Sequence, residues 1–429
     1  MRKTAQADIV LEVLPVAAKE VSVELTPGAL HGLRVIDLTT VIMGPFATAT
    51  LADMGADVIK VESLDGDMSR DIGARRHQGM SALTLNLQRN KRSIAIDLAS
   101  EEGREILDDL VRNADVLVTN LRPSSRQKLG ITYERLSENN PGLILCTAQA
   151  YGSETALRDY PAYDDIVQAA SGAAKLTELI DGEPRYAPYV IADKVVGLYI
   201  VIAVLAAAME KNRTGLGQEV DVPMVDAMIG FNLVEHFGGH TFAPVEGNFG
   251  WARVLTPERV PHQTADGWIC IMPYSAKNWN DFFIIAGRPD LVNNPRYASV
   301  NDRHTHMGEL LCAIREAVPS RTTQEWLNLC QTQGIPASDL LDLAHAHENA
   351  YVLDQELITK RDHPTEGEYY ATRTPFAMSR TPISFSRHAP LLGEDTFTIL
   401  EDLGYSADRV RALADASVVT ATSPQATSS

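Results

Sequence analysis

Residues 33–62, LRVIDLTTVIMGPFATATLADMGADVIKVE, decide the fold. They hold two β-branched apolar runs, at 33–38 and 57–62, on either side of a helix-like segment that opens with Gly44 and Pro45. A strand, a helix and a second strand in this order form a βαβ unit, in which the helix returns the chain so that both strands run parallel. The stretch therefore predicts a parallel sheet that begins near residue 32.

The same alternation continues along the chain. Apolar runs at 93–98, 115–121 and 142–152 alternate with helical segments, the first of which, at 100–114, starts with a serine and an acidic turn. Near-continuous apolar strands are typical of a parallel sheet covered on both faces. We therefore expect an α/β fold, a Rossmann-like parallel-sheet large domain with a smaller α+β domain, and ligands at the carboxyl ends of the strands.

Composition divides the chain into segments. Turn-forming residues gather in GGHTFAPVEGNFG, at 238–250, and indicate a domain boundary. The expected parts are an N-terminal arm at 1–27, the large domain at 28–225, a linker at 226–250, the small domain at 251–350, a second linker at 351–380, C-terminal helices that return to the large domain at 381–416, and a disordered tail at 417–429.

Charge and cysteine usage exclude several classes of protein. The 429 residues carry a net charge of −18, which repels phosphate backbones and anionic lipids, so we expect no nucleic acid and no membrane as partner. Four scattered cysteines and a first segment without a secretory layout indicate a reduced, cytoplasmic protein. His236 and His240 lack a third ligand at metal spacing, so we expect no metal.

Asp193 directly precedes a long apolar run in YVIADKVVGLYIVIAVLAAA, at 189–208. The run ends near Met209, short of the roughly 20 residues of a membrane span, and is interpreted as a buried core helix. Asp193 then has two open roles: a helix N-cap, or a carboxylate kept ionised by the helix dipole and available as a nucleophile. A capping carboxylate spends its lone pairs on backbone N–H groups, whereas an attacking one presents an oxygen to substrate.

Two basic loops follow the same logic of strand ends. RNKRSIAIDL at 89–98 and TNLRPSSRQKLG at 119–130 are interpreted either as solvated turns or as contacts to a phosphate-bearing ligand. The first loop of the sheet, TTVIMGP at 39–45, lacks the G-x-G-x-x-G fingerprint, which disfavours an NAD-type pyrophosphate site.

Several stretches, taken together, resemble CoA-transferase family III, the formyl-CoA transferase and carnitine CoA-transferase-like family. They occur in order over about residues 30–410: GLRVIDLTTVIMGPFATATLADMGADVIKVES, GDMSR, NKRSIAIDL, ADVLVTNLRP, GITYERLSENNPGLI, YDDIVQAASG, RTGLGQEVDVPMVDAMI, NNPRYA and APLLGEDTFTILEDLGY. The resemblance implies two ring-like chains interlocked as a homodimer, coenzyme A bound along the carboxyl edge of the large domain's sheet, and no metal.

Carried onto this chain, the resemblance implies that Asp193 is the catalytic residue. The implied CoA-binding residues, with those of the basic loops, are Ile42, Met43, Ser63, Lys91, Arg92, Ile96, Asp97, Leu98, Ala99, Asn120, Leu121, Arg122 and Lys128, and at the thioester end Tyr163, Asp164 and Met224. Ile42 and Ser63 stand where some members place Gln and Arg, and the family's glycine-rich closing loop has no counterpart in GNFGWARVLTP.

The expected reaction moves CoA from an acyl-CoA donor to a carboxylic acid acceptor through an aspartyl anhydride and an aspartyl-CoA thioester. An α-methylacyl-CoA racemase is the alternative on the same fold, but its histidine base would occupy the position of Tyr163. A non-catalytic CoA-binding protein is a further alternative, disfavoured by the presence of Asp193. Arg253, Arg259 and His262 are candidate partners for the second carboxylate of a dicarboxylic acid such as succinate.

Overall fold

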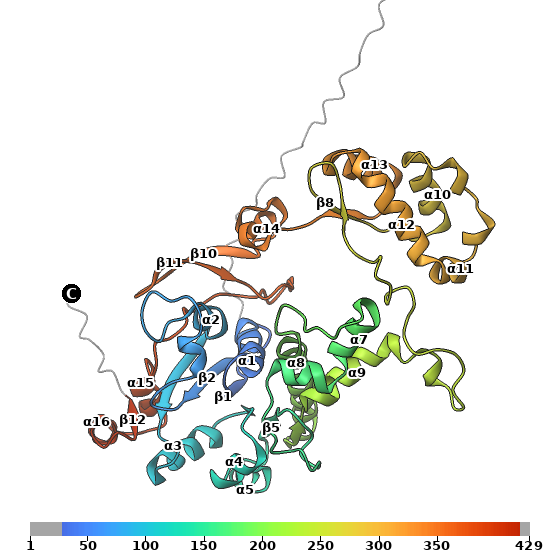
Figure 1. Cartoon of the computed structure of the whole chain (residues 1–429). Coiled ribbons are helices and arrows are strands. Elements are labelled where there is room, and N and C mark those ends of the chain that lie inside the picture. Colours follow the sequence, from blue (N-terminus) through green and yellow to red (C-terminus); the bar gives the residue numbers. More distant parts are fainter. Residues whose placement is uncertain (1–27, 421–429) are drawn as a thin grey trace, which may run out of the picture.

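The computed structural model describes residues 28–420, and within them the large domain is built on one seven-stranded sheet (Figure 1). The strand order is β12-β3-β2-β1-β4-β5-β6, in which β1 to β6 run parallel and β12 is antiparallel. The bounds are β1 Arg34–Leu38, β2 Asp57–Glu62, β3 Lys91–Ile96, β4 Val116–Thr119, β5 Ile144–Thr147, β6 Glu219–Asp221 and β12 Val419–Thr420. The predicted parallel-sheet core is confirmed.

Helices cover both faces of the sheet because alternate strand residues point to opposite sides. Val35 packs into one core with α1 and α8, and its neighbour Ile36 packs into another with α3, α15 and α16. The helices of the large domain are α1 Met43–Asp53, α2 Ala82–Leu87, α3 Glu101–Arg112, α4 Pro123–Lys128, α5 Tyr133–Asn139, α6 Asp164–Ala170, α7 Ala173–Asp181, α8 Ile191–Thr214 and α9 Met224–His236, with α15 Thr396–Asp402 and α16 Ala407–Asp415 from the end of the chain.

The small domain has its own core, set apart from the large sheet in Figure 1. A three-stranded antiparallel sheet is formed by β7 His262–Gln263, β8 Trp268–Ile271 and β9 Ala337–Asp339. Its core is shared with α10 Ala276–Ile285, α12 Met307–Ala317 and α13 Thr323–Gln333, and α11 Val300–Thr305 packs against α12. Its centre is aromatic: the rings of Phe282 and Trp326 stack at 6.0 Å between centroids.

Three expected boundaries differ from the structure. The linker expected at 226–250 begins inside α9, which stays with the large domain because it packs against α8. The linker expected at 351–380 contains α14 Ala350–Asp354 and a hairpin of β10 Ile358–His363 and β11 Gly367–Thr372. The tail expected from 417 starts with β12, which pairs with β3, while the arm at 1–27 and residues 421–429 lie outside the described residues.

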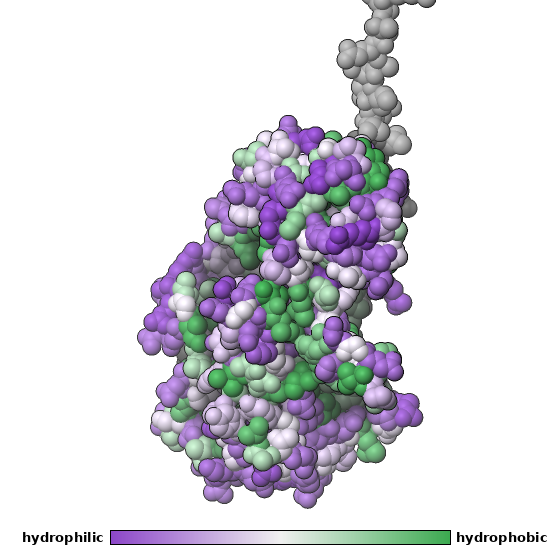
Figure 2. All heavy atoms as spheres, turned by 45° about the vertical axis from the view of Figure 1, so that its right-hand side comes forward, coloured by the Kyte–Doolittle hydropathy of each residue, from purple (hydrophilic) through white to green (hydrophobic). Residues whose placement is uncertain are grey.

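Helix α8 is only half buried, which corrects the prediction of a core helix. One side packs against α1, α6 and α9, whereas Leu198, Ile202 and Met209 are exposed. Among the described residues, α8 is the one helix whose length and apolarity would suffice to cross a membrane. Figure 2 shows hydrophobic side chains at the surface of the large domain below the hollow that separates it from the small domain.

Candidate active site

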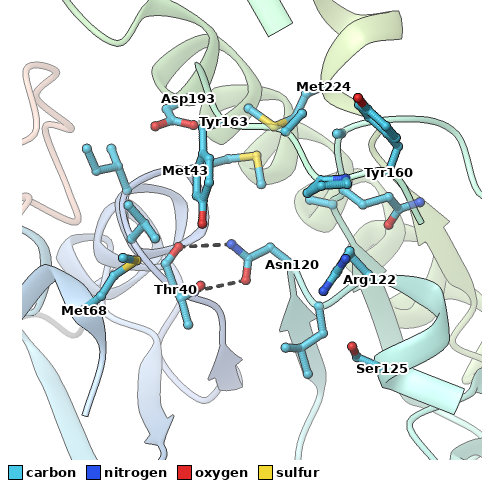
Figure 3. A pocket seen from close by; sticks show the side chains of 18 residues that line it. Thr40, Met43, Met68, Asn120, Arg122, Ser125, Tyr160, Tyr163, Asp193 and Met224 are labelled. Carbon is cyan, nitrogen blue, oxygen red and sulfur yellow. Dashed lines mark hydrogen bonds between the residues drawn. The ribbon is translucent and has the colours of Figure 1, made fainter. Parts of the chain in front are cut away.

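The strand order fixes where a ligand can enter. The connection after β1 leads to β2 on one side, and the connection after the adjacent strand β4 leads to β5 on the other side. Their loops therefore separate at the carboxyl ends of β1 and β4. Asn120, after β4, holds these loops in register, since its side-chain oxygen accepts from the Thr40 N–H and its amide donates to the Thr40 carbonyl, both at 3.0 Å (Figure 3). An opening at this point is the expected position for a ligand in a sheet of this type.

A cavity of about 310 Å³ occupies this opening. Its walls come from the loop after β1 with the start of α1, the loop after β4 with the start of α4, the segment after β5, the stretch before α6, the starts of α8 and α9, and Met68. Its lining includes Thr40, Val41, Ile42, Met43, Met68, Asn120, Leu121, Arg122, Ser125, Ala148, Gln149, Ala150, Tyr160, Pro161, Ala162, Tyr163, Asp193 and Met224. Asp193 and Tyr163 thus meet residues from more than a hundred positions earlier in the chain (Figure 3).

Asp193 does not cap its helix. The N-cap of α8 is Val190, Asp193 is the third helical residue, and no hydrogen bond from the described residues reaches its carboxylate. The backbone N–H of Asp193 instead donates to Oδ1 of Asp164, at 3.0 Å. Of the two roles that the sequence left open, the geometry therefore removes capping and leaves a free carboxylate at the cavity.

Asp164 is the residue that anchors the start of α8. Besides the bond from Asp193, it accepts from the side-chain amide of Gln168, whose oxygen accepts from the Ala187 N–H at 2.9 Å. Asp164 is 5% exposed and does not line the cavity, so its expected place among the ligand contacts is replaced by a positioning role.

The surroundings of Asp193 favour its neutral form. Burial and the nearby carboxylate of Asp164 raise the pKa of Asp193 to about 7, and the Lys194 ammonium opposes this only in part. A carboxylate with a raised pKa at a cavity wall is a more basic and more nucleophilic group than an exposed one.

A second cavity of about 440 Å³ adjoins the first through the residues Thr40 and Leu121, which line both. It lies over the carboxyl ends of β1, β2 and β3 and has a largely apolar wall. The expected contacts found there are Ser63, Ile96, Asp97, Leu98, Ala99 and Leu121.

The structure therefore divides the expected contacts into three sets. Ile42, Met43, Asn120, Leu121, Arg122, Tyr163 and Met224 line the cavity of Asp193. Asn120 contributes mainly by holding Thr40, because its oxygen and its amide nitrogen are both engaged there. Lys128 is exposed at the end of α4 and lines neither cavity, although its neighbour Leu129 lines the second one.

Lys91 and Arg92 do not belong to the site, and the reason is the direction of the strand. They begin β3, whereas the cavities lie where the strands end. Lys91 is 0% exposed and donates to Asp37 Oδ2 at 2.9 Å, and Arg92 pairs with Asp57 at 2.8 Å. Both cations are thus used inside the protein.

Buried ion pairs support the loop after β1 from below. Lys60 donates to the Thr39 carbonyl and lies 3.3 Å from Asp67 Oδ2, and Asp67 in turn accepts from the Val41 N–H. Burial would raise the pKa of Asp67, but attraction to the Lys60 ammonium and hydrogen bonds from the Ser69 and Val41 N–H groups hold it below its usual range. Val41 has φ 70°, a left-handed conformation that is strained for a β-branched residue.

Sequence reasoning missed several lining residues, among them Gln149 and Tyr160. Gln149 is two residues beyond the end of β5, so the rule that ligands gather at strand carboxyl ends would have found it. Tyr160 comes from an irregular stretch and packs edge-on against Tyr151, with ring centroids 6.3 Å apart. No local sequence pattern predicts this contact.

The structure places the three candidate cations of the small domain in different environments. Arg253 lines a cavity of that domain, Arg259 is exposed, and His262 is 3% exposed with neither ring nitrogen bonded to a described residue. Burial lowers the pKa of His262 and so favours the neutral ring. A buried, neutral ring does not offer a positive charge, so His262 is not a suitable partner for a carboxylate.

Fold and site together define an α/β protein with a free carboxylate at the switch point of a parallel sheet. The family model described as CoA-transferase family III matches residues 30–396. The chain therefore belongs to CoA-transferase family III, and the resemblance seen in the sequence is confirmed.

Curated relatives and solved structures agree with this assignment. The chain is 29% identical to formyl-CoA:oxalate CoA-transferase of Streptomyces coelicolor, over 92% of this chain and 100% of that protein. It is 32% identical to succinate--glutarate CoA-transferase of Agrobacterium fabrum, over 87% and 95%. A CAIB/BAIF family protein from Brucella suis superposes with a TM-score of 0.74 at 28% identity, over 88% of this chain and 100% of that one.

Proposed function

We propose that this CoA-transferase carries CoA on Asp193 between an acyl-CoA donor and a carboxylic acid acceptor. The observation that carries the proposal is the free carboxylate of Asp193 at the cavity, in a helix whose cap is supplied by another residue. The adjoining cavity over β1, β2 and β3 has the apolar wall that an adenine ring requires, and its junction with the first cavity would let the pantetheine arm reach Asp193.

The proposed reaction has two mirrored halves. A carboxylate oxygen of Asp193 attacks the thioester carbon of the donor, the C–S bond breaks, and an acyl-aspartyl anhydride and CoA thiolate result. The thiolate attacks the Asp193 carbonyl carbon, releases the donor acid as a carboxylate, and leaves an aspartyl-CoA thioester. The acceptor carboxylate then attacks this thioester, and the thiolate it expels attacks the acceptor's acyl carbon, which frees Asp193 with CoA on the new acid.

Exclusion of water is the protein's main task in this scheme, because an anhydride hydrolyses readily. The walls formed by Met43, Met224 and Tyr163 around Asp193 are suited to that task. The raised pKa of Asp193 adds to its nucleophilicity once the proton is lost.

We propose a short dicarboxylate as donor or acceptor acid. Curated relatives that cover most of this chain are named for oxalate, succinate and glutarate, and a human relative 29% identical over 91% of this chain is a succinyl-CoA:glutarate CoA-transferase. Arg122 in the loop after β4 lines the Asp193 cavity and could meet one anionic group there.

The racemase alternative requires a second base opposite Asp193. Tyr163 is at that position, 66% exposed and at the cavity wall, and a phenol lacks the imidazole nitrogen that serves as a base near pH 7. The proposal therefore stays with acyl transfer.

We also propose that the protein works as a homodimer, interlocked as the family resemblance implies. Support comes from the apolar side chains that α8 and α9 leave at the surface: Leu198, Ile202, Met209, Ile229, Phe231 and Val234. A patch of this kind on one face is typical of an interface with another protein chain.

Trapping the carrier tests the proposal directly. The protein is incubated with succinyl-CoA and glutarate, quenched with hydroxylamine, and digested for mass spectrometry. We expect a hydroxamate on Asp193 only when a donor is present, and no glutaryl-CoA from Asp193→Ala. Modification of another residue, or turnover by Asp193→Ala, would overturn the assignment, and a Tyr163→Phe variant with retained transfer separates it from a two-base mechanism.

A further inference from the structure

The small domain holds a cationic cavity that shares no residue with the Asp193 site. Its volume is about 240 Å³ and it lies between the residues just after the first linker, the start of α10, and α11 with the start of α12. Its basic lining residues are Arg253, Arg303 and His304, and no aspartate or glutamate lines it. In a chain of net charge −18, a cavity lined by cations alone is a departure from the rest of the surface.

Arg253 is held in place without using its hydrogen-bonding groups. Its guanidinium carbon lies 5.4 Å from the ring centroid of Trp251 and 5.4 Å from that of Tyr274, at cation–π distance from both. Among residues 28–420, no carboxylate lies within ion-pair distance of Arg253 and no hydrogen bond to its side chain is formed. The planar fork is thus fixed by two rings and still has its N–H donors free.

Arg303 faces the same cavity from α11. One of its terminal nitrogens donates to the carbonyls of Tyr297 and Ala298, each at 2.9 Å, so the side chain is anchored although it has no carboxylate partner in the described part of the chain. Two guanidinium groups that share a cavity without a counter-ion repel each other, and a bound anion would relieve that repulsion. The repulsion is also felt by His304, whose pKa is lowered by burial, by Arg253 and by Arg303.

The rest of the wall is apolar or weakly polar and suits a small carbon skeleton. Trp279, Val300 and Met307 provide it, and the first turn of α10, capped by Ser275, adds the positive end of a helix dipole. The cavity thus combines fixed positive groups with a hydrocarbon wall, which a bare inorganic anion would leave unfilled.

We propose that this cavity of the small domain, built around Arg253 and Arg303, binds the carboxylate of a short organic acid. The inference goes beyond the transfer reaction and does not rest on it, because it concerns binding at residues that the Asp193 site does not use. The guanidinium N–H groups of Arg253 would donate two hydrogen bonds to the carboxylate, and the aliphatic and aromatic wall would contact the carbon chain of the acid.

Binding can be followed optically because all four tryptophans, Trp251, Trp268, Trp279 and Trp326, belong to the small domain. The full-length protein is titrated with succinate and with glutarate, and tryptophan fluorescence is recorded together with calorimetry. Butyramide serves as an uncharged probe of similar size and sulfate as a bare anion. We expect saturable quenching by the two acids and weaker or no quenching by butyramide and by sulfate.

Arg253→Gln is the deciding variant and Arg259→Gln is its matched control, since both remove one positive charge from the same segment and only Arg253 lines the cavity. Loss of a charge-assisted contact should weaken acid binding by about 10- to 100-fold in Arg253→Gln, with binding by Arg259→Gln close to that of the unaltered protein. Equal binding by Arg253→Gln, an equal loss in both variants, or sulfate binding as tightly as succinate would each overturn the proposal. Circular dichroism of each variant checks the fold.

Discussion

At the scale of single residues, Asp164 at the start of α6 and Asp193 in the first turn of α8 are two carboxylates with different roles. The carboxylate of Asp164 accepts hydrogen bonds from the backbone N–H of Asp193 in α8 and from the side chain of Gln168. The carboxylate of Asp193 accepts none from the described residues and lies at the cavity. Burial disfavours ionisation of Asp193 most, and the nearby negative charge of Asp164 adds to that effect. The protonation of Asp193 therefore depends in part on the residue that positions its helix.

The first prediction concerns the pH dependence of transfer. Since the pKa of Asp193 is raised to about 7 and the ionised form attacks, kcat/KM should rise with pH and level off above about pH 7. Asp164→Asn keeps an oxygen for the Asp193 N–H but removes the negative charge, so the rise should move to lower pH by roughly 0.5 to 1 unit. Initial rates across pH measure this, and Asp165→Asn, an exposed neighbour, is the control that should leave the profile in place.

The second prediction concerns stability and carries the opposite sign from most carboxylates. The folded pKa of Asp193 lies near 7 and its ordinary value is 3.8, so its contribution to stability is fully present below pH 3.8 and is lost as pH rises through about 7. Asp193→Asn removes this loss. The variant should be more stable than the unaltered protein at about pH 8, on the order of 2 kcal/mol, with a much smaller difference near pH 4.

Urea unfolding at both pH values measures the difference. A variant that is less stable at high pH would show that the carboxylate is paired in a way the structure does not contain.

At the scale of elements, the crossing of α1 and α8 brings Asp193 beside the loop after β1. The helices approach closely at Gly197, where an added Cβ would lie 2.8 Å from Phe46 Cδ1 and 2.9 Å from the Met43 carbonyl oxygen. A glycine in a helix interior weakens the helix by roughly 1 kcal/mol, so its use here reflects the packing.

The third prediction follows from this crossing. Gly197→Ala should force α8 away from α1, lower the free energy of unfolding by about 1 to 3 kcal/mol, and reduce kcat because Asp193 moves with its helix. Gln331→Ala is the control: it is an exposed position of α13 in the small domain, away from α1 and from the proposed interface, and it should leave both unfolding and kcat close to those of the unaltered protein. Thermal unfolding with transfer assays compares the pair, and equal behaviour would contradict the role of the crossing.

The sequence predicted the strands and helices that a local pattern of residues defines, and it did not predict those that depend on a distant partner. The alternation of apolar strands and helices from β1 to β5 gave the parallel sheet, and the strand-end rule gave the loops that line both cavities. The hairpin of β10 and β11 was missed because a linker was expected from 351, and β12 was missed because a two-residue strand is defined only by its distant partner β3.

Site prediction shows the same limit. The place of Asp193 before the apolar run singled it out, and the resemblance implied its catalytic role together with seven other residues that line its cavity. Lys91 was wrongly placed because its basic character hid its burial beside Asp37. The function of Asp164 as the support of α8 depends on a hydrogen bond across 29 positions, which no spacing rule contains.

At the scale of the whole molecule, the exposed apolar faces of α8 and α9 lead to the fourth prediction. The unaltered protein should sediment as a dimer, and a variant with Ile202→Glu and Val234→Glu should be monomeric or aggregated, because two charges would be buried at the interface. Leu343→Glu, an exposed apolar residue on another element, is the comparison. A monomeric unaltered protein would refute the homodimer.

The pairing of β12 with β3 has a consequence for synthesis on the ribosome. The edge of the large sheet is completed by Val419 and Thr420, and α15 and α16 arrive only shortly before. The small domain, by contrast, is contiguous from about 251 to 339, so its whole core has left the exit tunnel while the large domain still lacks its final layer. The small domain is thus able to finish folding first, and the large domain must wait until residues 396–420 have been synthesised.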